Sequence, residues 1–469
     1  MLVVILICAG LTISYLYRHM NLKPGGAEWT ATVNNASNGA DIHAVRINNA
    51  GDIYVGGSFS DSTGFEKDGR TINKGGIPGV YNSFIGEYNS DGSCVNLTFL
   101  GDESTTFELN GMCPDTEGNV IARGFFKGEF SFGSGPDANR VESGGENDYA
   151  AVKIDTTGTV LWAYALGDYK NNYFMDLAVT PENDVLIAGR FQDSIDFDPS
   201  SAHDQRRSSN GGMDCFLVEL NPQGELKRVW TWGGFFEDGA TGVDCDSNGN
   251  IYVSGNFSDK VDLDPGPGVD ERSAITKKDG DGFLIKIGPD GSFQWCATLA
   301  WAKFIDFREI YVVTSESGDS YVSGNYYNDE FQTPTLGGGM DLFLEKIGPD
   351  GKVVFQKNWG GPQIDLFSSL SFDEGSNHVF VSGFFLDEVD FDTGPGSVIR
   401  GTSMEQRGMR KQDSFVSEFD ENGEFVDVGI FDYPMMVKGM SADNSGNVYL
   451  GIVYPDGAST LAKYRNFSK

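Results

Sequence analysis

The sequence predicts an all-β fold, a seven-bladed β-propeller of four-stranded antiparallel blades that an N-terminal strand closes by completing the last blade. Three observations predict it. A glycine-containing strand segment recurs seven times, each copy lies in a longer repeat with four strand patterns, and the strand missing at the C-terminal end has a counterpart near the N-terminus. A four-stranded repeat of this size is typical of a propeller blade, because solenoid repeats usually span about 20 to 47 residues.

The composition agrees with many short strands joined by tight turns. The 469 residues include 62 glycines and 16 prolines, and aromatic residues make up 13% of the chain. Glycine supplies the positive φ that hairpin turns require. The formal net charge of −34 would repel phosphate groups, so nucleic acid is excluded as an expected partner. This acidity indicates a soluble, self-repelling surface or, as the alternative, cation binding.

An apolar segment precedes the repeats. Residues 2–17 read LVVILICAGLTISYLY and are followed by Arg18, His19 and Lys23. The run is shorter than the about 20 apolar residues of a membrane span, and neither a preceding basic residue nor an A-x-A cleavage site accompanies it. We interpret residues 1–26 as a targeting or anchor segment with a linker, and residues 27–469 as the propeller.

This segment also bears on the cellular location of the propeller, and it contains two signals that disagree. Basic residues after the apolar run favour a cytoplasmic propeller, whereas a propeller behind an apolar leader favours export. We expect export to the periplasm, the cell surface or the extracellular space, with membrane contact only through residues 2–17.

Strand B of each repeat carries the recurring glycine. The copies include DIYVGGSF (52–59) and NIYVSGNF (250–257), and NVYLGIVY (447–454) is a weaker seventh copy. A turn such as 48–51 or 246–249 precedes each copy, which predicts an A–B hairpin. The shared glycines are spaced 59 to 69 residues apart and are Gly57, Gly124, Gly189, Gly255, Gly324 and Gly383.

Strands C and D complete each repeat. Segments such as DCFLVEL (214–220) alternate apolar and polar residues, as a strand does, and a second turn such as 221–224 leads into strand D. The seventh repeat ends after strand C at 459–465, and residues 27–33 match strand D of the fourth repeat, with Trp29 aligned to Trp295. We therefore expect residues 27–33 to complete blade seven and to remove its open edge.

The repeat resembles the bacterial SBBP-type β-propeller repeat, through its GNxYVxGxF, D-x-F-L and DFDPGPG-like segments. The resemblance covers nearly all of residues 27–469 and implies a secreted or surface-attached propeller of mostly unassigned function. Blade five departs from the pattern because it lacks the DFDP segment, and blade one has Asn82 where other blades have aspartate. The resemblance therefore implies a fold and a location but no activity.

Acidic pairs open three of the loops between strands B and C. Alternate residues of an extended segment point the same way, so each pair could offer two carboxylates to a hard cation such as calcium. The interpretation that we favour is that these aspartates accept hydrogen bonds from turn amides. The candidate calcium ligands are Asp196, Asp198, Asp262, Asp264, Asp390 and Asp392.

A second acidic series recurs near the start of the inner strands, at the expected mouth of the central channel. Such a ring would attract a cation or a basic ligand through its summed field. The alternative that we favour is that these residues join neighbouring blades through backbone amides. The one histidine expected there has no partner nucleophile, so packing is favoured over catalysis. The channel-mouth residues are Asp41, His43, Glu108, Asp176, Asp238, Asp306 and Asp365.

The predicted function is that of an exported, non-enzymatic and monomeric binding or adhesion module. Its ligand would be a protein or a carbohydrate, bound by the B–C and D–A loops, with calcium as the only candidate cofactor. The sequence has no CxxC, HExxH, GxSxG or phosphate-loop motif, so no catalytic residue is assigned. The alternative is a propeller lyase or hydrolase that uses channel-mouth carboxylates. Trp162 and Trp295 are expected to pack between blades.

Overall fold

The structure is a computed structural model. It describes residues 26–465 except 35–39, 49, 77–79, 102–104, 133–138, 144–147, 167–171, 199, 201–203, 275–279, 300–309, 328–338, 403–411, 434 and 456. The predicted leader lies outside the described residues. Within the described part of the chain, no helix has the length and apolar character needed to cross a membrane.

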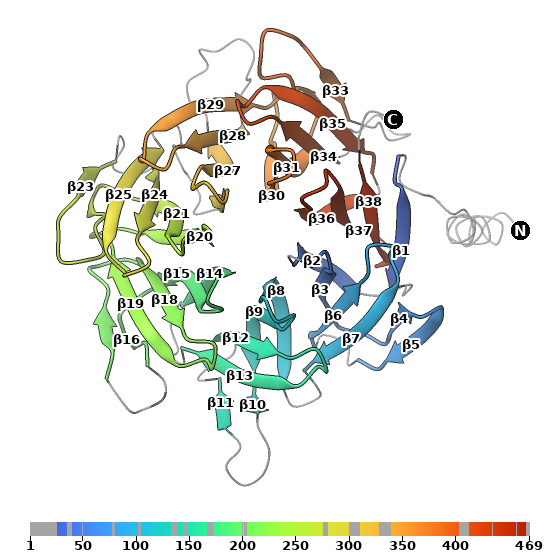
Figure 1. Ribbon diagram of the computed structural model, residues 1–469, viewed down its shortest axis with the longest axis horizontal. Helices are drawn as coiled ribbons and strands as arrows, with labels where there is room; N and C mark the ends of the chain where they lie inside the picture. Colours follow the sequence, from blue (N-terminus) through green and yellow to red (C-terminus); the bar gives the residue numbers. More distant parts are fainter. Residues whose placement is uncertain are drawn as a thin grey trace, which may run out of the picture.

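Seven antiparallel blades surround a common axis, as predicted (Figure 1). Each blade has strands A to D from the axis to the rim. Blades one to three are β2 (Ala40–Ile47), β3 (Ile53–Phe59), β6 (Asn82–Tyr88), β7 (Cys94–Leu100); β8 (Thr106–Pro114), β9 (Val120–Lys127), β12 (Asp148–Ile154), β13 (Val160–Ala165); and β14 (Tyr173–Val179), β15 (Val185–Phe191), β18 (Asp214–Leu220), β19 (Leu226–Trp232).

The remaining blades follow the same order. They are β20 (Gly239–Cys245), β21 (Ile251–Phe257), β24 (Asp281–Ile287), β25 (Phe293–Leu299); β26 (Tyr311–Thr314), β27 (Ser320–Tyr327), β28 (Met340–Ile347), β29 (Val353–Trp359); β30 (Leu366–Asp373), β31 (His378–Phe385), β34 (Asp413–Phe419), β35 (Phe425–Phe431); and β36 (Met436–Ala442), β37 (Val448–Val453), β38 (Ser459–Tyr464), β1 (Trp29–Asn34).

Strand β1 closes the ring, which confirms the expected closure. It runs antiparallel to β38, with Trp29 opposite Lys463 and Ala31 opposite Leu461. In Figure 1 the first strand lies beside the last strands of the chain. Pairing between the two ends of the chain therefore leaves no gap between β38 and the rim of blade seven.

The recurring strand-B glycine has a steric cause in the inner strand. Strand β2 has a β-bulge between Ile42 and Ala44, and five other inner strands have a bulge at the same place. A Cβ atom on Gly57 would lie 1.9 Å from the carbonyl oxygen of Asp41, and one on Gly255 would lie 2.1 Å from that of Gly239. Only glycine fits there, because a bulge brings the inner backbone against strand B.

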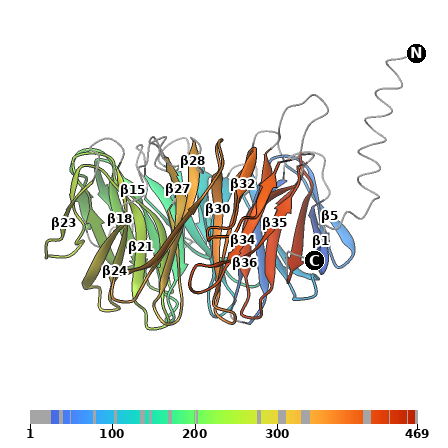
Figure 2. The same cartoon turned by 90° about the horizontal axis from the view of Figure 1, so that it is seen from above.

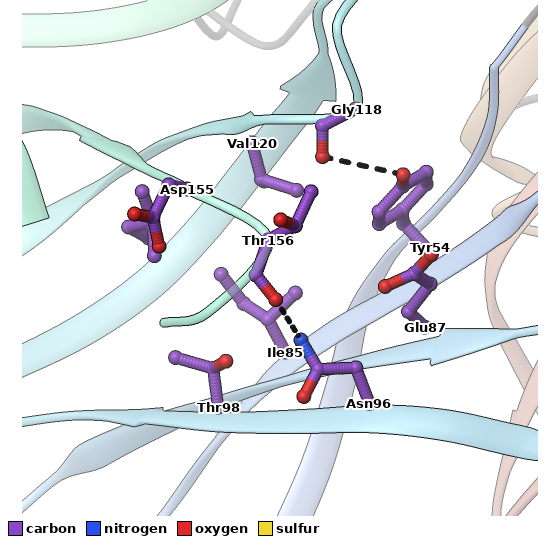
Figure 3. A pocket seen from close by; sticks show the side chains of 10 residues that line it. Tyr54, Ile85, Glu87, Asn96, Thr98, Gly118, Val120, Asp155 and Thr156 are labelled. Carbon is purple, nitrogen blue, oxygen red and sulfur yellow. Dashed lines mark hydrogen bonds between the residues drawn. The ribbon is translucent and has the colours of Figure 1, made fainter. Parts of the chain in front are cut away.

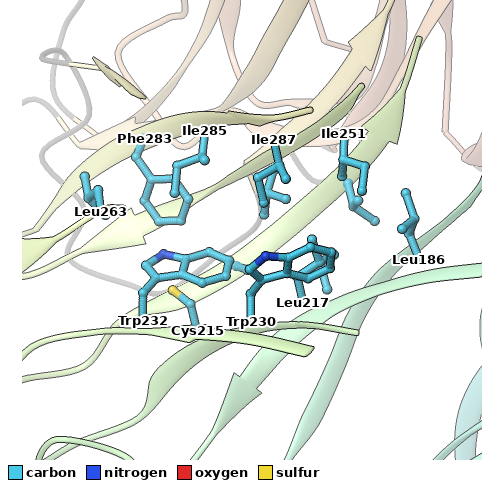
Figure 4. Close-up of a cluster of buried hydrophobic side chains, with 14 of the residues drawn as sticks. Leu186, Cys215, Leu217, Trp230, Trp232, Ile251, Leu263, Phe283, Ile285 and Ile287 are labelled. Carbon is cyan, nitrogen blue, oxygen red and sulfur yellow. The ribbon is translucent and has the colours of Figure 1, made fainter. Parts of the chain in front are cut away.

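The core lies between neighbouring blades. Trp230 and Trp232 of blade three pack against Phe283 and Ile285 of blade four (Figure 4). Large rings in these gaps contribute much of the buried apolar area. The indole N–H of Trp162 donates to Pro222 O at 3.1 Å, and that of Trp295 donates to Pro349 O at 3.0 Å. Both carbonyls belong to the next blade, so the predicted packing between blades is confirmed for these tryptophans.

Five B–C connections contain a short hairpin that the sequence did not predict. These hairpins lie at the rim of the disc in Figure 1, and Figure 2 shows the disc from its edge. They are β4 (Thr63–Lys67) with β5 (Arg70–Lys74), β10 (Glu129–Phe132) with β11 (Asn139–Glu142), β16 (Ser194–Asp196) with β17 (Arg206–Ser208), β22 (Lys260–Asp262) with β23 (Glu271–Ser273), and β32 (Glu388–Asp390) with β33 (Ile399–Gly401). We call the end formed by the B–C and D–A connections the loop face, and the opposite end the turn face.

Candidate functional site

The acidic B–C loops bury the apolar residue that separates their two aspartates. Phe197, Leu263 and Phe391 are each 0% exposed. Phe197 packs among blade-two side chains of strand D, and its carbonyl accepts a hydrogen bond of 2.8 Å from the Tyr164 hydroxyl. The apolar residue between the two aspartates therefore anchors each loop to the preceding blade. The aspartates lie on either side of this residue.

The first aspartate of each loop holds the loop closed. Asp262 Oδ1 accepts the N–H groups of Asp264 at 3.1 Å and of Asp270 at 2.8 Å. Asp196 and Asp390 accept the equivalent pairs of amides. In Asp196 the amide of Asp198 is the main cause of a lowered pKa. Charge-assisted bonds of this kind stabilise the ionised carboxylate.

The second aspartate of each loop caps the next turn. Asp264 Oδ1 accepts the Gly266 N–H at 2.7 Å, and Asp392 Oδ1 accepts the Gly394 N–H at 2.8 Å. Asp198 accepts the Ser200 N–H in the same way. Among the described residues, no three or more His, Cys, Asp or Glu side chains are grouped so that they could hold a metal ion. This geometry supports the turn interpretation, and the calcium site stays a prediction.

The predicted channel-mouth residues occupy three different register positions. Asp41 lies opposite Ser58 and Glu108 opposite Phe125, so these two are equivalent. Asp176 lies beyond the bulge of its strand, opposite Ala188. Asp238 and Asp365 precede their inner strands. Asp306 lies outside the described residues. The described members therefore do not share a single register position around the axis.

Asp238 and Asp365 organise two D–A connections of the loop face. Both side chains are fully buried. The two oxygens of Asp238 accept the N–H groups of Gly234 and Ser258, at 2.6 and 2.8 Å. Asp365 accepts those of Gly361 and Leu386. The connections read GGFFED (233–238) and GGPQID (360–365), a shared G-G-x-x-x-D pattern that sequence reasoning missed.

A second buried carboxyl lies beneath each of these two connections. A Cβ atom on Gly233 would meet the carboxyl of Asp214 at 2.4 Å, and one on Gly360 would meet Asp341 Oδ1 at 2.2 Å. Burial raises the pKa of Asp214 to about 6 and those of Asp238, Asp341 and Asp365 to about 7. In the Asp341 carboxyl, the charge of Asp365 adds to the effect of burial. Desolvation disfavours the ionised form, so the carboxyls of Asp238, Asp341 and Asp365 bind protons at a higher pH than ordinary aspartates do.

Asp176 belongs to a charged group near the axis rather than to the loop face. Its Oδ2 accepts the Val243 N–H at 3.1 Å, and burial raises its pKa while Arg123 and Arg46 oppose that rise. Burial also raises the pKa of Asp244 to about 7, with Arg46 opposing that rise, and Asp244 Oδ2 accepts the Thr314 N–H at 2.7 Å. The hydrogen bonds of Asp176 and Asp244 therefore connect the inner strands of blades three, four and five, a structural use of these carboxyls.

His43 and Glu108 have different surroundings. The Nε2 atom of His43 lies 2.8 Å from Ser58 Oγ, and burial lowers the pKa of the imidazole while the charge of Asp41 opposes that change. Glu108 pairs in register with Phe125, whose ring centroid lies 4.1 Å from that of Tyr149. The His43 contact agrees with its packing interpretation, whereas Glu108 is half-buried and burial raises its pKa.

Exposed apolar side chains occur on several of the B–C and D–A connections. Phe235 is 73% exposed, and its ring lies edge-on to that of Phe236 at a centroid distance of 5.3 Å. Val269 of a B–C loop is 78% exposed. Among the described residues, the large exposed apolar residues of these connections are Tyr81, Phe235, Phe236, Val269, Ile364 and Tyr433, together with Ile72 and Ile399 in hairpin strands at the rim. The loop face therefore offers the apolar contacts from which binding surfaces are built.

Comparisons with known proteins agree with the fold. No family model matches the chain. It is 22% identical over 214 residues to an uncharacterised WD repeat-containing protein of Acanthamoeba polyphaga mimivirus, covering 40% of this chain and 15% of that protein. It is 31% identical over 142 residues to the regulatory protein FlaEY of Caulobacter vibrioides, covering 29% of this chain and 15% of that protein. The matched segments thus span a small part of either relative.

Solved propellers resemble the chain in outline. A Dos1 propeller is 10% identical with a TM-score of 0.48, covering 92% of this chain and 95% of that one. The structure of U3-55K is 8% identical with a TM-score of 0.47, covering 93% and 99%. At this similarity the comparison carries no argument about function. The strands and their pairing define the class: the chain is a seven-bladed β-propeller, a fold that commonly serves as a binding module.

Proposed function

We propose that the chain is an exported, non-enzymatic β-propeller that binds a protein partner through its loop face. The observation that carries the proposal is the 73% exposure of Phe235 on a connection held by buried hydrogen bonds. An aromatic side chain on an ordered loop gains contact area at a small cost in conformational entropy. The loop therefore has the properties of an anchor for a partner.

The chemistry of the face favours a protein over a carbohydrate. Phenylalanine, valine and isoleucine dominate its exposed apolar residues, and these side chains offer no hydrogen bonds to sugar hydroxyls. The net charge of −34 favours a partner with a basic rim around an apolar patch. The apolar run at residues 2–17 supports export, the other part of the proposal.

The enzyme alternative receives less support from the loop face. Asp238 and Asp365 are fully buried, and both oxygens of each accept backbone N–H groups. A general acid or base must reach the proton that it transfers. These two carboxyls reach loop amides instead, and so they act as loop supports.

A displayed library of random peptides would test the proposal. Peptides selected on the full chain should bind a Phe235→Ser/Phe236→Ser variant at least about tenfold more weakly, because the anchor is lost. A matched control, Val353→Ser/Val354→Ser, removes two exposed apolar residues from the rim strand β29 and should leave binding unchanged. Equal loss in both variants, or selection of no peptide, would contradict the proposal.

A further inference from the structure

A pocket opens on the turn face between blades one and two, at the opposite end from the proposed partner surface. It is a shallow hollow that is open to solvent. Figure 3 shows Tyr54 and Glu87 side by side, across the pocket from Asp155, with Ile85 and Val120 between them. The pocket thus combines a carboxylate and an aromatic ring with an apolar floor.

The pocket exists because blade one lacks a ring that other blades have. In blades seven, two and four, the N–H groups of Trp29, Trp162 and Trp295 donate to a carbonyl in the C–D turn of the next blade. Asn96 occupies this position in blade one, and its Nδ2 donates to Thr156 O at 2.7 Å. Asn96 therefore keeps the hydrogen bond between blades, and because its side chain is smaller than an indole it leaves a shallow hollow at this junction.

Blade one also lacks the cation that other blades place at this junction. In the four blades where strand D has an aromatic residue at the position of Asn96, the strand-C residue opposite it is lysine. Three of these lysines lie over the strand-B tyrosine: Lys286 at 5.0 Å from the Tyr252 ring, Lys346 at 5.2 Å from the Tyr321 ring and Lys463 at 5.8 Å from the Tyr449 ring. In blade one the tyrosine is present as Tyr54, but the lysine position is Glu87. The ring is thus present without its cation.

The other two blades with glutamate at this position supply a basic partner of their own. Glu219 of blade three pairs with Arg228, which lies opposite it, and with Lys227 at 2.9 Å. Glu418 of blade six lies 2.6 Å from His378 Nδ1. These basic side chains compensate the glutamate within the chain.

Glu87 has no such partner among the described residues. The position of His378 is taken in blade one by Asp52, and that of Arg228 by Asn96. Burial raises the pKa of Glu87, the charge of Asp52 raises it further, and Lys67 opposes both. A cation bound beside this carboxylate would offset both unfavourable effects.

We propose that this pocket binds an alkylguanidinium or alkylammonium group. The charged group pairs with the Glu87 carboxylate and lies against the face of Tyr54, as Lys286 does with Tyr252. The alkyl chain packs on Ile85 and Val120, since arginine and lysine bury their stems on apolar surface. The ligand takes the place of the basic side chains that occupy this junction in other blades. Its site is independent of the loop face.

Calorimetric titration of the full chain with ethylguanidinium, and with a blocked pentapeptide containing one central arginine, tests this proposal. Ethylguanidinium should bind, and ethylurea, which has a similar shape without charge, should not. Glu87→Gln should weaken binding at least about tenfold. Asn96→Trp should abolish binding by filling the pocket as Trp162 fills the next junction. Both variants should keep the wild-type melting temperature.

A matched control separates the site from general electrostatics. Glu182→Gln removes the same charge from an exposed residue of the turn face at another junction, and should leave binding within about twofold. Tighter binding of the peptide than of ethylguanidinium supports a protein side chain as the ligand, and equal binding supports a small cation. Absence of binding, equal binding of ethylurea, or equal effects of Glu87→Gln and Glu182→Gln would overturn the proposal.

Discussion

The two ends of the propeller are organised by aspartates that act in different ways. On the turn face the acid closes a short turn within its own blade: Asp246 Oδ1 accepts the N–H groups of Asn248 and Asn250, both at 2.9 Å. On the loop face, Asp238 connects a D–A connection to the start of a B–C loop. The turn face is uniform because the same local turn is repeated in each blade. On the loop face, buried acids join separate loops, and the loops themselves can therefore differ between blades.

Both faces depend on a closed ring, so loss of ring closure should have the largest effect on the melting temperature. Deleting residues 1–33 removes most of β1 and leaves the outer edge of β38 unpaired, so we expect a large fall in melting temperature or failure to fold. Deleting residues 1–25 should leave the melting temperature unchanged. Equal melting temperatures of the two truncations would contradict the role of β1.

Removing an acid from each end should sharpen the comparison. Asp246→Ala should lower the free energy of unfolding by about 2 to 3 kcal/mol, because four buried or half-buried donors lose their acceptor. Asp262→Ala should cost only about 1 kcal/mol, because it frees two amides of a more exposed loop. Urea unfolding of both variants measures the difference, and the reverse order would contradict it.

The buried acids should make the stability of the loop face depend on pH. Burial raises the pKa of Asp341 from 3.8 to about 7, so the folded state binds more protons than the unfolded state between these values. The free energy of unfolding contributed by this group therefore falls as the pH rises from about 4 to about 7. Melting curves from pH 5 to 8 should be flatter for Asp341→Asn than for wild type.

Blade one provides the matched reverse change for that experiment. Asn82 occupies the position of Asp341 and is buried. Asn82→Asp should therefore steepen the fall in melting temperature with rising pH. An unchanged pH profile in both variants would show that these positions do not titrate in the range.

Calcium should have the smallest effect, because Oδ1 of each leading loop aspartate already accepts two amides. We expect excess calcium to raise the melting temperature by no more than about 1 °C relative to chelator. A larger rise that Asp262→Asn/Asp264→Asn removes would make these loops metal sites and support a calcium-dependent binding role.

The parts of the fold that repeat in sequence were predictable, and the parts that differ between blades were not. The glycines at 57 and 255 indicated the blades because each faces the same bulge, although the bulge itself has no sequence signal of its own. The closing strand was predictable from Trp29 because its hydrogen bond repeats in other blades. Residues that recur in the sequence thus indicate contacts that recur between the blades.

The candidate site was less predictable because chain order does not determine register. Asp41 and Asp238 both lie near the start of an inner strand in the sequence. In the structure, Asp41 is part of strand β2 and lies opposite Ser58, whereas Asp238 is buried in a D–A connection. The G-G-x-x-x-D pattern was visible in the sequence at 233–238 and 360–365. A search of the connections for repeats, and not only of the strands, would have found it.

The pairing of β1 with β38 in blade seven also determines when during folding the ring can close. Strand β1 precedes the first blade in the chain, and its partner β38 follows the other six blades. Contacts between such distant residues form late, because loop closure must precede them. Strands of the other blades can pair as they emerge, but the ring stays open until the last repeat is available. A truncated product would therefore expose an unpaired edge, which would mark it for aggregation or degradation.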